Sequence, residues 1–575
     1  MITHRLIGLV LFICISLKPV VQAVQDNKRM FNDIEAIQNV FQVKDAPAEW
    51  KKEYAGWDLS REVERVKSLI QQQDLSIRDY QKLLLSFFHS MKDYHVMVNF
   101  YATEMSILPF RLHGAKGRYF IAWLPGEVGD IELDPEMIRF LKNARVGDEV
   151  ISLNGVSAEA YVQDFCQKIY GNETNGTDQM LAEQYLTLRL AEMGHSVEEG
   201  PIEIRIKHQN SEAIDTYVPE WIYVPEEIKN DFPSIAAKIQ HKKNKARKEF
   251  KFFKAEKVNP IYPQVLRAQK SVKKAFKGSH ADTDFFILGQ HKSFVPPLGP
   301  LIWEDSHSHH YSYIFQWKGK KIGYVRIPTY AVFGYEYRDF EKVMRFFQQE
   351  TDALVIDQLN NPGGMVVYLF ALLSMLTDQP LELPLERITI TQQDVSEALD
   401  ILDSPEEYLE AWEQGMAGYS ISKEDSSALI AYFKNIIQEW NSGRIFTAPL
   451  YYYGISSVKP HPEVRYTKPI LVLVNALDFS CADFFPAILQ DNGRAKIFGS
   501  KTAGAGGYVL NHEYPNLFGI KGFSYTGSIA YRTNQQPLEN LGVTPDFVYE
   551  MTDEDLMNNY QPYSEALLKA LDSLL

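Results

Sequence analysis

A chain of 575 residues is too long for one hydrophobic core, since cores rarely grow past about 300 residues, so more than one domain is expected. Hydrophobic residues make up 45% and charged residues 23% of the chain, which is the composition of a folded globular protein and not of a disordered one. The formal net charge of -15 argues against nucleic acid as the main partner. Of the three cysteines, Cys14 lies in a leader, and Cys166 and Cys481 are far apart, so no disulfide framework is predicted.

Residues 1–23 have the three parts of a signal peptide. Arg5 gives a charged start, residues 6–17 form an apolar stretch too short to span a bilayer, and residues 21–23 (VQA) are a small-residue cleavage site. A signal anchor is the alternative, which the cleavage site and the missing stop-transfer charges disfavour. No later stretch is long and apolar enough for a membrane helix. We therefore expect the mature protein to be secreted, soluble and without a membrane anchor.

Residues 24–106 form a predicted N-terminal helical region. Helical periodicity runs through residues 33–93, including a clear amphipathic segment over 77–91. His95 follows, and the alternation of apolar residues over 96–100 predicts a strand. A single histidine beside a strand is usually structural or exposed, so this one matters only if the fold pairs it with another reactive group.

The stretch over residues 144–158 contains the sequence GDEVISLNG, an apolar strand between a Gly-Asp loop and an Asn-Gly hairpin turn. It resembles the strand–turn–strand element of PDZ domains, and an ordinary Asn-Gly hairpin is the alternative. With strand-like runs at 201–206 and 216–221, we place a PDZ-like domain at 107–224. Such domains hold extended peptides by adding them as a strand.

Residues 225–289 differ in character from the rest of the chain. Lysine and arginine crowd residues 238–277, with only Glu249 and Glu256 opposing them over its densest part, and phenylalanines are interleaved. A basic, aromatic stretch is one form of nucleic-acid site. With an export signal present, we prefer a linker that docks on the acidic remainder of the chain, and we expect no nucleic-acid partner.

Residues 290–575 form a predicted α/β unit. A strand over 321–327, a helix over 337–349 and a buried strand over 353–357 follow one another, as in βαβ units. An acidic helical insertion is expected over 394–442.

A strand–turn–helix element carries the most reactive candidate. A buried strand is predicted over 468–476, a helix with apolar residues over 484–489, and another strand over 495–498. Ser480 therefore lies at the N-terminus of a helix, where unpaired N–H groups, that of Cys481 among them, can hold an oxyanion. The alternative is a plain helix cap, since Ser-Cys-Ala-Asp is also a capping pattern.

Two short motifs supply further candidate groups. The sequence NNPGG over 360–364 follows a strand, and its two glycines let the backbone approach a ligand, so the N–H of Gly363 or Gly364 is a second candidate oxyanion donor. A tight strand–helix connection is the alternative. Glu539 precedes a Gly-Val-Thr-Pro turn, and a surface acid is its default interpretation.

The motifs NNPGG, SCAD (480–483), QDNGRA (490–495) and GSKTAGAGG (499–507) together resemble the tail-specific, or S41, serine peptidases. Most members of that family use a lysine 25 residues after the serine, and this position is Ala505 here. The tricorn-like branch and the chlamydial protease-like activity factors share that departure and use Ser, His and Glu. Resemblance to the latter covers nearly the whole mature chain, through further matches that include DAPAEWK (45–51), KDYH (92–95), GPLIWE (299–304), KPHPEVRYTKP (459–469), GIKGFS (519–524) and LENLGVTP (538–545).

The resemblance implies an α/β, multidomain (α+β) fold with an S41-type, ClpP/crotonase-like core. It assigns Ser480 as nucleophile, His95 as general base and Glu539 as the acid, with Cys481 and Gly363 or Gly364 in the oxyanion hole. The three side chains are so far apart in sequence that only folding can assemble them. No metal cluster, nucleotide loop or cofactor motif is found, so no cofactor or metal is expected.

The resemblance also implies a zymogen, in which residues 225–289 are an inhibitory segment that is cleaved. It implies a homodimer that acts on host proteins, with the host cytosol as one destination after export. The alternative function is a catalytically silent binding protein with an S41-type core and a PDZ-like domain.

Overall fold

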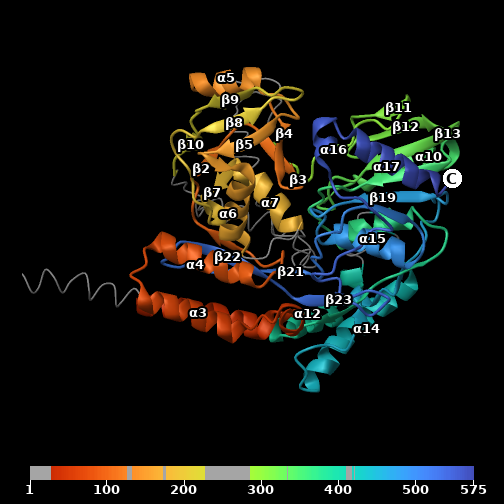
Figure 1. The fold of residues 1–575 in the computed structure, drawn as a ribbon. Coiled ribbons are helices and arrows are strands. Elements are labelled where there is room, and N and C mark those ends of the chain that lie inside the picture. The colour runs from red at the N-terminus through yellow and green to blue at the C-terminus, as the bar shows by residue number, and fades with distance from the viewer. Residues whose placement is uncertain are drawn as a thin grey trace, which may run out of the picture.

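The computed structural model describes residues 27–125, 133–171, 176–226, 285–332, 334–409, 418–419 and 421–575. The predicted signal peptide lies outside the described residues, as does residue range 227–284 of the basic segment. In the described part of the chain, N-terminal helices, a β-rich domain and an α/β unit lie together (Figure 1), so the predicted fold class is confirmed. No helix in these ranges is long and apolar enough to cross a membrane.

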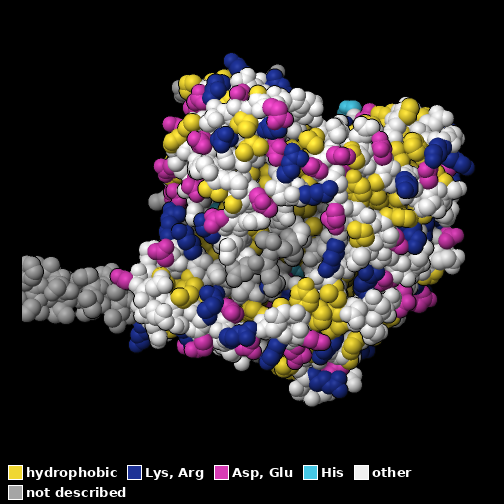
Figure 2. Space-filling view, in the orientation of Figure 1, with side chains coloured by type: hydrophobic (Ala, Val, Ile, Leu, Met, Phe, Trp, Pro, Cys, Tyr) yellow, Lys and Arg dark blue, Asp and Glu magenta, His cyan; other side chains and the backbone are white. Residues whose placement is uncertain are grey.

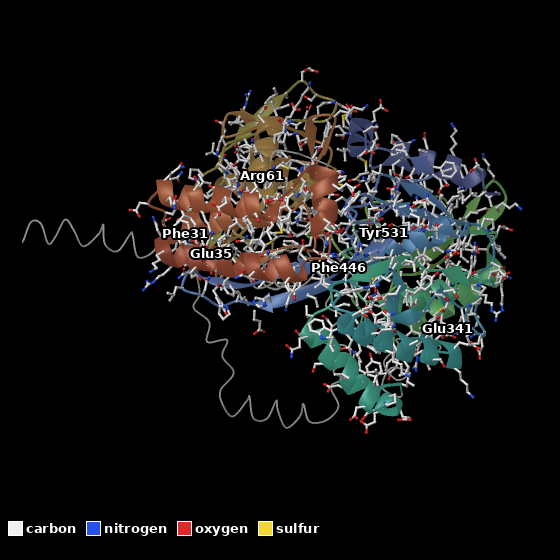
Figure 3. All side chains as sticks on the ribbon, turned by 90° about the horizontal axis from the view of Figure 1, so that it is seen from below. Phe31, Glu35, Arg61, Glu341, Phe446 and Tyr531 are labelled. Atoms are coloured by element: carbon white, nitrogen blue, oxygen red, sulfur yellow. The ribbon has the colours of Figure 1, made fainter. Side chains whose placement is uncertain are left out.

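The N-terminal region is helical, as predicted. Residues 27–44 form the first helix, followed by α2 (Ala48–Ala55), α3 (Leu59–Gln72) and α4 (Ile77–Ser90). Aspartate and serine caps start α3 and α4, and the apolar stripes of these helices are buried. In Figure 3 the first helix is marked by Phe31 and Glu35, and the carboxylate of Glu35 pairs with Lys67 of α3 at 2.9 Å.

The PDZ-like domain is built on an antiparallel sheet in the order β3-β4-β5-β8-β9, with β6 beside β5. Its strands are β3 (Arg111–Ala115), β4 (Arg118–Trp123), β5 (Glu149–Leu153), β6 (Val156–Ser157), β8 (Ile204–Lys207) and β9 (Ile214–Tyr217), and its helices are α5 (Pro135–Asn143), α6 (Ala158–Tyr170) and α7 (Gly176–Leu186). Asn154 and Gly155, with φ of 50° and 75°, turn β5 into β6 as the Asn-Gly motif predicts. A small sheet of β2 (Met105–Ile107), β7 (Leu188–Leu190) and β10 (Ile222–Val224) lies below.

The α/β unit is organised on a sheet of seven strands in the order β11-β12-β13-β14-β19-β20-β24. They are β11 (Leu301–Asp305), β12 (Ser312–Trp317), β13 (Lys320–Arg326), β14 (Ala353–Asp357), β19 (Ile470–Val474), β20 (Lys496–Gly499) and β24 (Phe547–Val548), and those from β13 onward are parallel. Both central strands, β14 and β19, are buried along their whole length, which explains their continuous apolar sequences.

Helices cover both faces of this sheet. Ile356 and Val472 belong to the core that α10 (Tyr337–Glu350), α11 (Val366–Ser374) and α15 (Cys481–Asp491) complete on one face. Their neighbours Val355 and Leu471 belong to the core shared with α17 (Gln561–Asp572) on the other. A short helix, α16 (Asp553–Met557), precedes α17.

Where the helical insertion was expected, the structure has α12 (Gln392–Asp403) and α14 (Lys423–Asn441), each started by a capping box. These helices extend from the bottom of the molecule in Figure 1. The sequence around them forms short strands, namely β15 (Leu381–Glu382), β16 (Leu385–Ile388), β17 (Leu450–Tyr451) and β18 (Ser457–Val458), and β16 pairs with β23 (Ser528–Tyr531). Acidic and basic side chains are interspersed over the face seen in Figure 2.

One small sheet pairs a strand from the N-terminal region with two strands from the C-terminal part of the chain. Strand β1 (Val98–Phe100) pairs with β22 (Ile520–Thr526), which pairs in turn with β21 (Val509–Glu513). The ring of Phe41 stacks on that of Phe523 at 5.7 Å between centroids, so the first helix also packs on this sheet. The segment that carries His95 is thereby held against the C-terminal part of the α/β unit.

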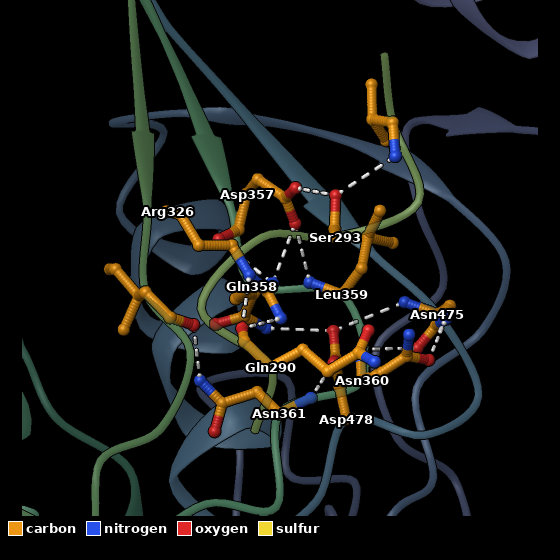
Figure 4. Close-up of polar contacts among 12 residues, drawn as sticks. Gln290, Ser293, Arg326, Asp357, Gln358, Leu359, Asn360, Asn361, Asn475 and Asp478 are labelled. Carbon is orange, nitrogen blue, oxygen red and sulfur yellow. Dashed lines mark hydrogen bonds and ion pairs between the residues drawn. The ribbon is translucent and has the colours of Figure 1, made fainter. Parts of the chain in front are cut away.

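A buried ion pair lies at the carboxyl ends of the central strands (Figure 4). Arg326 ends β13 and Asp357 ends β14, and the guanidinium donates to Asp357 Oδ1 at 2.9 Å with neither side chain exposed. The same oxygen accepts from the Leu359 N–H at 2.9 Å, and Ser293 donates to the other oxygen. The pair therefore fixes the direction in which the chain leaves β14.

Removing one partner of this pair should be costly, because the other charge stays buried without compensation. We expect Arg326→Met to lower the free energy of unfolding by about 3–5 kcal/mol. The double variant Arg326→Met/Asp357→Leu should lose less than the single one. Urea denaturation measures this, with Lys321→Met as control, since the Lys321–Glu350 pair is exposed and pairs of that kind contribute about 1 kcal/mol or less. An Arg326→Met protein as stable as wild type would contradict the interpretation.

Candidate active site

Ser480 lies between β19 and the first residue of α15, with φ 56° and ψ -116°. Ser480 and Asp483 do form a capping box, but the aspartate and serine caps of α3, α4 and α14 have negative φ, namely Asp58 at -140°, Ser76 at -66° and Ser422 at -89°. A capping role does not require the rare left-handed backbone, which costs roughly 1–3 kcal/mol in a residue other than glycine. A sharp strand-to-helix turn of this kind presents a nucleophilic serine in hydrolases.

The NNPGG segment lies directly against this turn. A side chain on Gly363, whose φ is 83°, would put its first carbon 2.5 Å from the Phe479 carbonyl oxygen and 2.8 Å from Ser480 Cβ, so only glycine fits. Gly364 packs equally closely on Tyr330. The Gly363 N–H donates to Asn361 Oδ1 at 2.9 Å, and the Cys481 thiol donates to the Gly364 carbonyl at 3.3 Å.

Asn361 and Asp478 connect the two loops (Figure 4). The Asn361 N–H donates to Asp478 Oδ1 at 3.0 Å, and its amide group donates to the Ile327 carbonyl at 2.9 Å. The Phe479 N–H donates to the Asn361 carbonyl at 3.0 Å. Burial raises the Asp478 pKa well above its usual value. The position of Gly363 beside Ser480 therefore follows from side-chain bonds that the buried Asp478 and Asn361 make with backbone groups.

Asp483, one turn into α15, organises the next loop. Its carboxylate accepts from the N–H groups of Ser480 at 3.0 Å, Gly504 at 2.8 Å and Ala505 at 2.9 Å. Burial raises its pKa to about 6. Ala505, the position where most S41 members have their lysine, is fully buried in the apolar core. An amine at this position would therefore be buried among apolar side chains.

His95 precedes β1 and is held close to the Ser480 turn. Tyr94 precedes His95, Phe479 precedes Ser480, and the rings of Tyr94 and Phe479 pack edge to face with their centroids 5.6 Å apart. The Ser524 hydroxyl donates to the His95 carbonyl at 2.6 Å. The imidazole is fully buried, and neither ring nitrogen has a hydrogen-bond partner in the part of the chain that the structure describes. Burial lowers the His95 pKa to about 4, so the ring is neutral at pH 7.

Glu539 is completely buried, so its default interpretation as a surface acid is wrong. Its Oε2 accepts from the Gly506 N–H at 2.9 Å, and its Oε1 accepts from the Lys51 ammonium. Burial raises the Glu539 pKa, with a smaller contribution from Asp93, and the adjacent Lys51 ammonium opposes this rise and stabilises the carboxylate. The loop over 502–507 therefore connects the carboxylate of Glu539 to that of Asp483.

Lys51 and Asp93 are the members of this cluster that sequence reasoning missed. The Lys51 ammonium also donates to the Lys92 carbonyl and to Asn540 Oδ1, both at 2.9 Å, and lies 3.8 Å from Asp93 Oδ2. Burial lowers the Lys51 pKa, but the carboxylates of Glu539 and Asp93 outweigh burial and the pKa is raised. Both residues stand in motifs quoted above, DAPAEWK and KDYH, which were their only signal in the sequence.

The structure thus brings the segments of all three predicted residues together without joining their side chains. The segments of His95 and Ser480 are in contact through the rings of Tyr94 and Phe479. The loop over 502–507 donates backbone N–H groups to the carboxylates of both Asp483 and Glu539. Within the described ranges no hydrogen bond joins the His95 ring to Ser480 or Glu539. Neither Cys166 nor Cys481, both of which are buried, forms a disulfide in the described part of the chain, and no group of three metal-binding side chains is found among the described residues.

Comparison with known proteins identifies the family. The PDZ domain profile matches residues 104–228, and the profile of peptidase family S41 matches residues 321–549. A protein of Chlamydia muridarum is 34% identical over 574 residues, covering 93% of this chain and 91% of the relative, and one of Chlamydia trachomatis is 35% identical with 94% and 92% covered. The chain belongs to peptidase family S41. It is a serine peptidase, a hydrolase of protein or peptide substrates, and the predicted family and enzyme class are confirmed.

Two crystal structures are similar over nearly the whole chain. Mature CPAF is 31% identical, with a TM-score of 0.78, and the match covers 95% of this chain and 98% of that one. Mature CPAF complexed with lactacystin gives the same identity and TM-score, with 95% and 99% covered. The S41 member described here therefore has the CPAF-like arrangement of N-terminal helices, PDZ domain and catalytic core.

The neutral, buried state of His95 predicts a pH dependence of stability. Because its pKa is lowered from 6.5 to about 4 in the folded protein, the unfolded chain binds a proton between these values that the folded chain does not. The free energy of unfolding should therefore fall as the pH is lowered from 6.5 towards 4. In His95→Asn the slope should be smaller by up to about 1.4 kcal/mol per pH unit. Urea denaturation between pH 4 and 7 measures it, and equal slopes would contradict the assignment.

Proposed function

We propose that this peptidase hydrolyses peptide bonds through Ser480 as nucleophile, His95 as general base and Glu539 as the acid, as an endopeptidase. The observation that carries the proposal is the strained backbone of Ser480 at the N-terminus of α15, with Gly363 packed against it. The neutral imidazole of His95 is in the protonation state that a general base requires.

The chemical steps follow from these groups. The His95 ring takes the proton of the Ser480 hydroxyl as its oxygen attacks the scissile carbonyl, and the imidazolium so formed is stabilised by the carboxylate of Glu539, directly or through water. The Cys481 N–H at the positive end of α15, with that of Gly363 or Gly364, holds the oxyanion. In this structure the Gly363 N–H donates to the side-chain oxygen of Asn361. For this N–H to serve in the oxyanion hole, it must give up that bond and donate to the oxyanion.

The active arrangement differs from the one described above in the partners of two side chains. His95 must reach Ser480, and Glu539 must turn part of its carboxylate from Lys51 towards the imidazolium. Catalytic hydrogen bonds often form only when substrate is bound, so their absence in the free protein is compatible with this role.

We expect Ser480→Ala and His95→Ala each to lower the rate of casein hydrolysis by about 10⁴-fold or more, and the double variant to lose little beyond that, because members of a catalytic unit are not additive. Glu539→Ala should lose less, and adding Ala505→Lys to His95→Ala should restore nothing. A fluorophosphonate should label Ser480 in the wild type alone. Full activity of His95→Ala would overturn the assignment, and an unlabelled, folded wild type would favour a silent binding protein.

We further propose that the chain is exported as a zymogen, forms a homodimer and acts on host proteins, including proteins of the host cytosol. The inhibitory segment would be 225–289, and the positions of its described ends support this. It leaves the small sheet of β2, β7 and β10 at the end of β10 and returns with Phe285 buried, after which the Gly289 N–H donates to the Asn360 carbonyl at 3.0 Å. A tether fixed beside the NNPGG loop has a high local concentration, on the order of millimolar, so weak docking suffices for inhibition.

Processing within this segment should give an N-terminal piece with His95 and a C-terminal piece with Ser480 and Glu539. The pieces should stay associated, because the pairing of β1 with β22 and their shared core hold them together. Mass spectrometry and gel filtration of aged wild type, beside Ser480→Ala as the uncleaved control, test this. A single intact chain with full activity would rule the zymogen out, as would one separated piece that retains activity.

A further inference from the structure

A narrow cavity of about 70 Å³ lies beside Ser480. Ser480 and Gly364 line one part of it, and most of the remaining wall is apolar, including Phe370 of α11 and Phe484 and Ile488 of α15. Ser480, Phe484 and Ile488 follow one another at intervals of one helical turn, so the cavity runs along α15 for about 12 Å. A cavity of this shape suits one long side chain.

Glu386 of β16 lines the same cavity, and the structure around it does not account for the burial of its carboxyl group. The residue is only 5% exposed, and its Oε1 has no hydrogen-bond partner in the described part of the chain. Ala530, which faces Glu386 across the pairing of β16 with β23, also lines the cavity. A buried polar atom left unpaired is destabilising, so a ligand that donates to it is favoured.

Burial raises the Glu386 pKa to about 8, with a small opposing effect from Ser528. Tyr432, which is buried, and Tyr508, which is partly buried, have raised pKa values, chiefly through desolvation and partly through nearby carboxylates that include Glu386. The empty cavity is therefore close to neutral at pH 7. A cation that entered it would lower the Glu386 pKa and restore the carboxylate as its partner.

We propose that this cavity receives the substrate side chain on the acyl side of the scissile bond, and that Glu386 selects a side chain that ends in a cationic hydrogen-bond donor, as lysine does. The inference rests on the proposed role of Ser480: in the acyl-enzyme the substrate carbonyl is bonded to its Oγ, so the adjacent side chain begins beside this cavity. The methylene stem of lysine packs on apolar walls, and its ammonium supplies the donor that Oε1 lacks. Glu386 is thus a specificity-determining residue.

The test uses two peptidyl-coumarin amides that differ only in the acyl-side residue, lysine in one and norleucine in the other. Norleucine keeps the four-carbon stem of lysine and has a hydrogen atom in place of the ammonium group. We expect kcat/KM of the wild type to favour lysine by at least about tenfold, equivalent to about 1.4 kcal/mol. Glu386→Gln should reduce this ratio strongly, and Glu386→Met should reverse it. Glu382→Gln, which changes an exposed acid on the neighbouring β15, is the matched control and should keep the wild-type ratio.

The outcomes separate this inference from the function on which it rests. A wild type that cleaves both substrates without preferring lysine overturns the inference and leaves the peptidase function intact, and this measurement needs no variant to fold. A Glu386→Gln variant that keeps the wild-type ratio of kcat/KM for the two substrates also overturns the inference and leaves the peptidase function intact. If neither substrate is cleaved and a fluorophosphonate fails to label Ser480, the proposed nucleophile is wrong, and the inference falls with it.

Discussion

The position of Ser480, the proposed nucleophile, depends on a buried ion pair at the carboxyl ends of β13 and β14. Arg326 and Asp357 end two parallel strands, and the loops that follow β14 and β19 start from this edge of the sheet. Buried charges are tolerated only when they are paired and hydrogen-bonded, and here the Asp357 carboxylate also accepts from Ser293 and from the backbone of Leu359. From that fixed point, Asn361 and Asp478 hold one loop against the other, so that Gly363 reaches Ser480.

A second buried charge cluster holds the proposed acid. Lys51 comes from the N-terminal helices and Glu539 from the C-terminal part of the chain, and their contact is made away from water. The ammonium is shared among Glu539, Asp93 and backbone or amide oxygens, which satisfies its donors within the core. Buried pairs contribute little net stability, but they are specific in geometry. The cluster therefore acts chiefly to position Glu539 and the segment that leads to His95.

Much of the fold around Ser480 could be predicted, because buried parallel strands and capped helices leave local patterns in the sequence. The strand over 353–357 and the helix beginning at Tyr337 are found where they were expected. The burial of Glu539 could not be predicted, since the chain has 74 acidic residues and an ion pair to a lysine 488 positions away leaves no periodic pattern. The same holds for the unpaired carboxyl of Glu386.

The pairing of β1 with β22 has a consequence for biosynthesis. The segment after His95 is translated long before its partner strand β22 and Glu539, which come much later in the chain. Contacts between residues so distant in sequence form late in folding, because the entropy of closing a long loop opposes them. A growing or incompletely folded chain therefore lacks the contacts that bring the segments of His95, Ser480 and Glu539 together, and we expect activity that depends on these residues only after this late pairing has formed.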